Sequence, residues 1–105
     1  MYSYDQALSI VSRRVARQSA GGEEHAVDEG KTTAHEWGWV FVYDAKKYVE
    51  TGDVQYALMG NGPILFNKHT GEVRHCGSAH PPEHYVEEYE AELLNAPLAD
   101  QESPS

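Results

Sequence analysis

Five side chains that can bind metal or take part in catalysis lie close together in the sequence: His69, His75, Cys76, His80 and His84. A zinc site needs three or four such ligands in a tetrahedral arrangement. His80 and His84 are four residues apart, but Pro81 and Pro82 stand between them, before a helix is established, and no second pair faces them from a distant segment. The pattern favours scattered surface histidines, and we predict no bound metal or cofactor.

Cys76 next to His75 has the residue types of a nucleophile and its base. Neighbours in a strand point to opposite faces, and a free cysteine in a strand is usually a small buried hydrophobe. The sequence contains no phosphate-binding loop, dinucleotide fingerprint or nucleophile elbow, and Gly60-Asn61-Gly62 fits a structural turn better than a phosphate cradle. We predict that the protein is not an enzyme. A thiol or metal enzyme is the alternative that Cys76→Ala and metal analysis would test.

The charge of the chain points to a protein partner. The 105 residues include 17 acidic and 8 basic side chains, a net charge of −9, and the length fits one domain. Residues 81–105 contain no lysine or arginine, whereas Arg13, Arg14 and Arg17 lie in the first twenty residues. Affinity for nucleic acid comes mainly from lysine and arginine, so we exclude that partner. A basic protein surface is the better match.

Localisation follows from three absences in the sequence. Cys76 is the single cysteine, which excludes an intramolecular disulfide and fits a reducing cytosol. The first residues lack the apolar region of a signal peptide, and no run reaches the ~18 apolar residues that a membrane span needs. We expect a cytoplasmic protein with no membrane partner.

The first element that the sequence predicts is a helix from a Ser3 cap to about Gln18, which the Gly21-Gly22 pair ends. Its apolar residues recur at helical spacing: Tyr4, Leu8, Val11 and Val15. A short strand near residues 25–28 is expected to pair with the aromatic run 37–43, and residues 29–36 read as a loop. Alternation places Trp37, Trp39, Phe41 and Tyr43 on one face of that run, and Val40 and Val42 on the other.

The second half of the chain predicts a hairpin and a helix. Asp44 is expected to cap a helical turn that Gly52 closes. Residues 64–67 and 72–76 form the hairpin, with Gly71 at a position that favours positive φ. The last helix is expected from Glu83 to about Asn95, with Pro82 suited to its first turn. Its buried stripe consists of Val86, Tyr89 and Leu93.

These elements predict an α+β fold: an N-terminal helix, an antiparallel meander of about four strands and a C-terminal helix, with both helices packed on the sheet. We expect the arginine-bearing first helix and the glutamate-bearing last helix to lie side by side. Residues 1–96 form the predicted domain, and residues 97–105 a polar tail.

Two features are candidates for protein binding. One is the acidic face of the last helix, and the other is the aromatic run; together they supply Trp37, Trp39, Glu83, Glu87, Glu88 and Glu90. Such an acidic face is also typical of a helix that is merely solvated, and the aromatic face can equally be covered by a loop of the same chain.

Several short motifs occur together in this order: Trp39-Val40-Phe41-Val42-Tyr43-Asp44-Ala45, Tyr48-Val49-Glu50-Thr51-Gly52-Asp53, Gly60-Asn61-Gly62-Pro63-Ile64, Asn67-Lys68-His69-Thr70-Gly71-Glu72-Val73, Gly77-Ser78-Ala79 and Glu83-His84-Tyr85-Val86-Glu87-Glu88-Tyr89-Glu90. Over about residues 37–91 the chain resembles the YrhB-like family, also known as the immunity protein 35 family. The first helix fits that family only in position, and residues 20–36 match poorly.

The resemblance implies an α+β fold with a characteristic tryptophan and a Gly-x-Gly motif, roles that would fall on Trp39 and on Gly60 with Gly62. Family members are predicted immunity proteins, encoded beside bacterial polymorphic toxins, and one branch is described as chaperone-like. The family supplies no catalytic residues. We therefore expect an immunity protein that neutralises a cognate toxin by direct binding, with a chaperone-like holdase as the alternative. A homodimer is left open.

Overall fold

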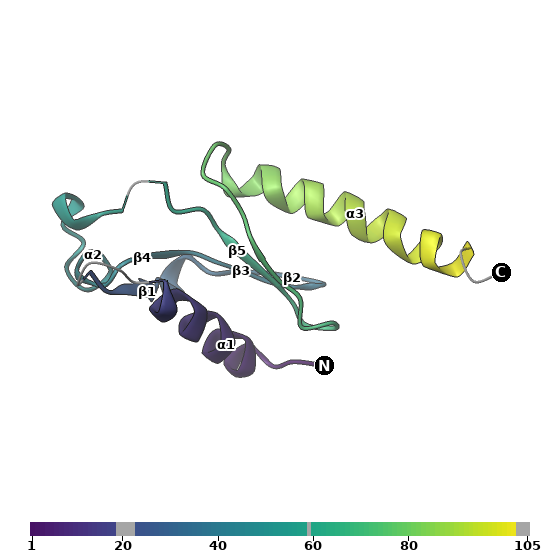
Figure 1. Cartoon of the computed structure of the whole chain (residues 1–105), viewed down its shortest axis with the longest axis horizontal. Helices are drawn as coiled ribbons and strands as arrows, with labels where there is room; N and C mark the ends of the chain where they lie inside the picture. Colours follow the sequence, from purple (N-terminus) through teal and green to yellow (C-terminus); the bar gives the residue numbers. More distant parts are fainter. Residues whose placement is uncertain (19–22, 59, 103–105) are drawn as a thin grey trace.

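The computed structural model describes residues 1–18, 23–58 and 60–102, and it confirms the α+β fold. The elements in chain order are α1 (Tyr4–Arg17), β1 (His25–Val27), the 3-10 turn η1 (Glu29–Lys31), β2 (Thr33–His35), β3 (Gly38–Phe41), β4 (Tyr43–Ala45), α2 (Lys46–Thr51), the 3-10 turn η2 (Val54–Tyr56), β5 (Ile64–Asn67), β6 (Val73–His75) and α3 (Pro82–Glu102). Figure 1 shows the helices α1 and α3 on either side of the strands.

In the described part of the chain the strands form two antiparallel sheets, one of four strands in the order β2-β3-β5-β6 and one of the pair β1-β4. The predicted hairpin is confirmed as β5 and β6, and the predicted first strand as β1. The loop expected over residues 29–36 is wrong, because η1 and β2 form there. Thr33 and Ala34 of β2 are exposed. This edge strand is therefore held through its backbone pairing with β3, and its sequence carries little apolar signal.

The aromatic run forms two strands, not one. It breaks at Val42, so β3 pairs with β5 while β4 pairs with β1. Trp39, Phe41 and Tyr43 share one face, as predicted. The prediction is wrong for Trp37, which lies in the turn before β3 and packs with Val40 on the opposite face. Strand alternation starts only at Gly38, whose φ of 154° is rarely open to other residues and whose Cβ would lie 1.9 Å from the Phe66 carbonyl oxygen.

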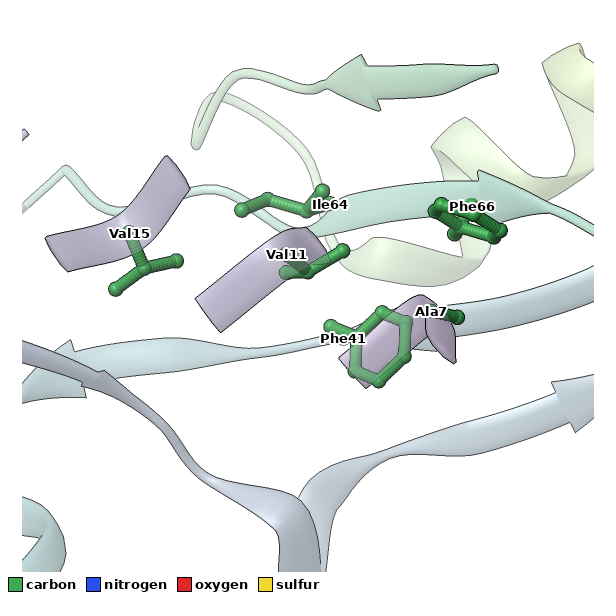
Figure 2. Close-up of a cluster of buried hydrophobic side chains, with 6 residues drawn as sticks. All are labelled: Ala7, Val11, Val15, Phe41, Ile64 and Phe66. Carbon is green, nitrogen blue, oxygen red and sulfur yellow. The ribbon is translucent and has the colours of Figure 1, made fainter. Parts of the chain in front are cut away.

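The first core lies between α1 and one face of the sheet (Figure 2). Its fully buried members are Ala7, Val11, Val15, Phe41, Ile64 and Phe66. Burying one large apolar side chain contributes about 1.5–3 kcal/mol, so the cluster as a whole holds α1 on the sheet. Ser3 caps α1 through a capping box with Gln6, as predicted, and the helix reaches its C-cap at Gln18. The predicted Gly21-Gly22 stop lies outside the described residues.

The second core lies on the other face of the sheet, under α3. Trp37, Val40, Leu65 and Tyr89 are buried there, and Val86 and Leu93 pack against them, which confirms the predicted stripe of the last helix. The expectation that the two helices lie side by side is wrong (Figure 1). Ile64 and Phe66 point to one face and Leu65 to the other, so each face of the sheet needs its own helix.

Two predicted helix ends also need correction. Ala45 is the N-cap of α2, and Asp44 is buried in β4, where its Oδ1 accepts hydrogen bonds from the amides of Ala45 (2.8 Å) and Leu58 (2.7 Å). Gly52 ends α2 as predicted, and Gly71 has the predicted positive φ of 80°.

α3 begins at Pro82, one residue before the expected start at Glu83, and continues to Glu102, past the expected end at Asn95. Most residues after Asn95 are good helix formers, and Pro97 alone does not stop the helix. A helix of 21 residues is about 30 Å long, whereas strands of four residues span about 13 Å. Its C-terminal part therefore projects beyond the sheet (Figure 1). The division into residues 1–96 and a tail of 97–105 stays a prediction.

Candidate protein-binding surface

A buried polar network fixes the position of α3 on the sheet. Tyr89 of α3 is only 2% exposed, and its hydroxyl accepts a hydrogen bond from Asn67 Nδ2 (3.0 Å) and donates one to Glu72 Oε1 (2.9 Å). Burial, together with the neighbouring Glu72 carboxylate, raises the pKa of Tyr89. The hydroxyl therefore stays protonated and able to donate. This network sets which side of α3 faces the sheet and which side faces outward.

Arg74 of β6 makes a second set of contacts with α3, and these contacts are exposed. Its guanidinium contacts Glu92 (2.7 Å) and Glu72 (2.9 Å), and it lies 4.7 Å from the centre of the Tyr89 ring. The hydrogen bond from Arg74 holds the pKa of Glu92 below its ordinary value, and the same bond raises the pKa of Arg74. Glu92 is thus used to dock the helix, which leaves the other glutamates of α3 for contacts elsewhere.

The four predicted glutamates of α3 are all exposed: Glu83, Glu87, Glu88 and Glu90. Glu88 lies 3.3 Å from His84, one turn back on the same helix. Among the described residues, Glu83 and Glu87 have no ion-pair partner. The outward side of α3 is consequently an uncompensated anionic surface, able to attract a basic partner.

The two predicted tryptophans lie on opposite faces of the sheet. Trp37 is 7% exposed, and its Nε1 donates a hydrogen bond to Glu90 Oε2 (3.1 Å). Its ring meets Tyr89 edge-on, with the ring centres 4.8 Å apart. Trp39 is partly buried on the α1 side, 5.7 Å from the ring of Tyr4. The structure therefore brings Trp37 together with Glu90 of α3 and places Trp39 on the other face of the sheet.

A cleft of about 650 Å³ opens beside Trp37, at the end of the sheet where the β2–β3 and β5–β6 turns meet. The amide of Lys68 donates to the Trp37 carbonyl (2.7 Å) and joins the two turns. The lining residues are His35, Glu36, Trp37, His69, Glu90, Leu93 and Leu94. We call this the hairpin-tip cleft.

Of the residues that line this cleft, only Trp37 and Glu90 were predicted from the sequence to bind a partner. The signal that could have added Leu93 and Leu94 is their spacing, because residues three and four positions after Glu90 share its side of a helix. His35 and His69 carried no such signal. They meet because two turns come together, and His35 stacks on Trp37 with the ring centres 5.0 Å apart.

The cysteine and histidines considered for catalysis are spread from the β5–β6 turn, which contains His69, through β6 and the segment after it to the start of α3. His80 and His84 lie with their ring centres 4.0 Å apart, but no group of three metal-ligating side chains occurs in residues 1–18, 23–58 and 60–102. Cys76 is half-buried against the second core, and burial raises the pKa of its thiol. A thiol in that state is a poor nucleophile at neutral pH.

The Gly-x-Gly turn has a structural role. A Cβ on Gly62 would lie 2.0 Å from the carbonyl oxygen of Cys76 and 2.4 Å from that of Gly77, so only glycine fits against this backbone. Asn61 Nδ2 donates to the Tyr43 carbonyl (2.6 Å) and ties the turn to β4. The motif therefore connects three segments: β4, the residues that lead into β5, and the residues that follow β6.

Comparison with known proteins gives two matches. The model of the immunity protein 35 family matches residues 5–92. The uncharacterized protein YrhB of Escherichia coli (strain K12) is 42% identical over 53 residues, a match that covers 50% of this chain and 56% of YrhB. The chain thus matches little more than half the length of this relative. No solved structure matches significantly.

No described helix is both long and apolar enough to cross a membrane. The family match covers α1 from its second residue, the described strands and α3 as far as Glu92, including Tyr89. On this evidence the chain belongs to the immunity protein 35 family.

Proposed function

We propose that this protein is a non-enzymatic immunity protein of the bacterial cytoplasm, which binds a cognate toxin domain and blocks its active site by direct contact. Membership of the immunity protein 35 family supports the class of function. The observation that carries the mechanism is the anionic surface of α3, where Glu83 and Glu87 are exposed and have no ion-pair partner among the described residues. Unpaired surface charge of one sign speeds the capture of a partner of the opposite sign.

The polar contacts that hold α3 on the sheet support the same proposal. Tyr89, Asn67 and Arg74 hold the helix in one position, so its outward glutamates are presented at fixed spacing. A partner then meets a surface that needs little ordering on binding, which favours tight and specific association. A loosely held helix would suit a chaperone-like holdase better, because a holdase accepts many unrelated chains.

The test is co-expression with the product of the neighbouring gene. We expect the protein to restore growth to cells that express the toxin, and to co-purify with it at a one-to-one ratio. The comparison variant is Gly62→Ala, which retains every glutamate of α3 but is expected to be less stable, so weaker rescue by it would show that the folded protein is required. Failure of both rescue and co-purification, together with suppression of heat aggregation of several unrelated proteins, would replace the proposal with the holdase function.

A further inference from the structure

We propose that the hairpin-tip cleft binds an aliphatic side chain of the toxin together with an arginine that is adjacent to it in the toxin sequence. This inference rests on the proposed function and assigns the chemistry of one contact within it. The cleft has room for such a pair of side chains, since its volume of about 650 Å³ lies in the range typical of ligand sites.

The apolar part of the cleft is provided by Trp37, Leu93 and Leu94. Trp37 is almost fully buried and held from two sides, by the Tyr89 ring and by the stacked His35 ring, so it forms a rigid floor. Leu94 lies at the rim and is 74% exposed, so most of its apolar surface is still in contact with water. An aliphatic side chain that enters the cleft would cover both residues and remove this apolar surface from water.

The carboxylates of Glu90 and Glu36 are the reason for proposing a cationic group on the occupant. The described residues that line the cleft include these two carboxylates and no lysine or arginine. The Trp37 indole binds Oε2 of Glu90, and His35 Nδ1 lies 3.9 Å from the same oxygen. Oε1 has no described partner. The carboxylate is therefore oriented in advance, with one oxygen left for a donor from the partner.

Arginine fits this carboxylate better than lysine. A planar guanidinium can donate a hydrogen bond to the free oxygen of Glu90 and also stack against an aromatic or imidazole ring, and both a carboxylate and a histidine ring lie at this rim. The apolar floor and the free oxygen of Glu90 belong to the same cleft. Neighbouring residues of one extended segment can therefore fill both positions, as in recognition of a short peptide segment.

Substitutions in the complex with the neighbouring gene's toxin test the assignment. Glu90→Gln keeps an acceptor for Trp37 but removes the charge, and Leu94→Ala removes exposed apolar surface. We expect each to raise the Kd about tenfold or more, mainly through faster dissociation. The matched controls at the other end of the molecule, Glu50→Gln and Val54→Ala, should stay within about twofold of the wild type. If the toxin binds but both cleft variants match the controls, the cleft assignment is wrong and the proposed function survives.

A second measurement decides the assignment if the wild-type protein binds no toxin, which would remove the proposed function. Acetyl-Leu-Arg-amide is titrated while the indole N–H resonance of Trp37 is followed by NMR, with Trp39→Phe used for its identification. We expect a saturable shift with a Kd of about 1–10 mM, which Glu90→Gln weakens, and a much smaller shift with acetyl-Leu-Glu-amide or acetyl-Ser-Arg-amide. Equal responses to the three peptides, or no response, would refute the cleft assignment.

Discussion

At the residue scale, a few side chains determine how the segments meet. Gly62 is necessary because carbonyl oxygens of Cys76 and Gly77 occupy the space of a Cβ. Asn67 holds the β5–β6 turn through the amides of His69 (2.8 Å) and Thr70 (3.1 Å), while its Nδ2 reaches Tyr89. The close approach at Gly62 and the hydrogen bond between Asn67 and Tyr89 link residues that are distant in the chain. Their loss should therefore affect the whole fold.

Gly62→Ala should lower the free energy of unfolding by about 1–3 kcal/mol, because backbone must move to admit the methyl group. The control is Gly30→Ala, where the nearest atom to the added Cβ would be Asp28 Oδ1 at 3.6 Å. Its effect should stay within about 0.5 kcal/mol. Urea unfolding followed by tryptophan fluorescence measures both, and equal stability of the two variants would show that the close approach at Gly62 is not limiting.

At the element scale, α3 is the part of the molecule whose placement differs most from the sequence prediction. Its start, predicted to within one residue, and its buried stripe of Val86, Tyr89 and Leu93 follow from local signals, and the structure confirms the stripe. The face of the sheet that it covers does not follow, because an apolar stripe shows that a helix packs without showing where. The docking ion pair between Arg74 and Glu92 joins segments that no local pattern relates.

The ion pair between Arg74 and Glu92 should stabilise the fold at neutral pH and lose this effect as the pH falls. The pKa of Glu92 is held below its ordinary value of 4.5, so the contribution is present above that value and disappears as the pH falls through the depressed pKa. Glu92→Gln should therefore be less stable than the wild type at about pH 7, and the gap should close towards about pH 3. The control Glu87→Gln should show no such gap in urea unfolding. A gap for Glu92→Gln that persists at the lower pH would contradict this account.

The other features of the fold also differ in whether they depend on neighbouring residues or on residues that are distant in the chain. The Ser3 cap, α1 and the β5–β6 hairpin were predictable because capping, helical spacing and turn residues act within a few positions. Strand β2 was missed because Thr33 and Ala34 are exposed and bury no apolar face. The hairpin-tip cleft was missed for another reason. Trp37 and Glu90 are 53 residues apart, and their hydrogen bond exists only once the sheet has placed α3.

At the scale of the whole molecule, charge is distributed unevenly across the sheet. Arg13, Arg14 and Arg17 are exposed on α1, on the opposite side from the glutamates of α3 (Figure 1). A basic toxin surface approaching from solution would be attracted to α3 and repelled from α1, so the field orients the encounter as well as accelerating it.

Reversing part of this charge should slow association with the toxin. The double variant Glu87→Lys and Glu88→Lys is expected to lower the association rate about tenfold at about 20 mM salt and far less at about 300 mM, where screening is strong. Glu50→Lys serves as the control, since Glu50 lies on α2, away from α3. Stopped-flow fluorescence gives both rates, and an association rate that is unchanged at low salt would exclude steering by α3.

The sheet also separates the protein into two layers that can change independently. The α1 layer contains Val11, Phe41 and Phe66, and the α3 layer contains Trp37, Leu65 and Tyr89. Under the proposed function, a gene that changes only the outward residues of α3 and keeps its buried stripe can therefore recognise a different toxin while both cores are retained. Recognition can diversify in a chain of this size because the outward residues of α3 are not the residues that pack against the sheet.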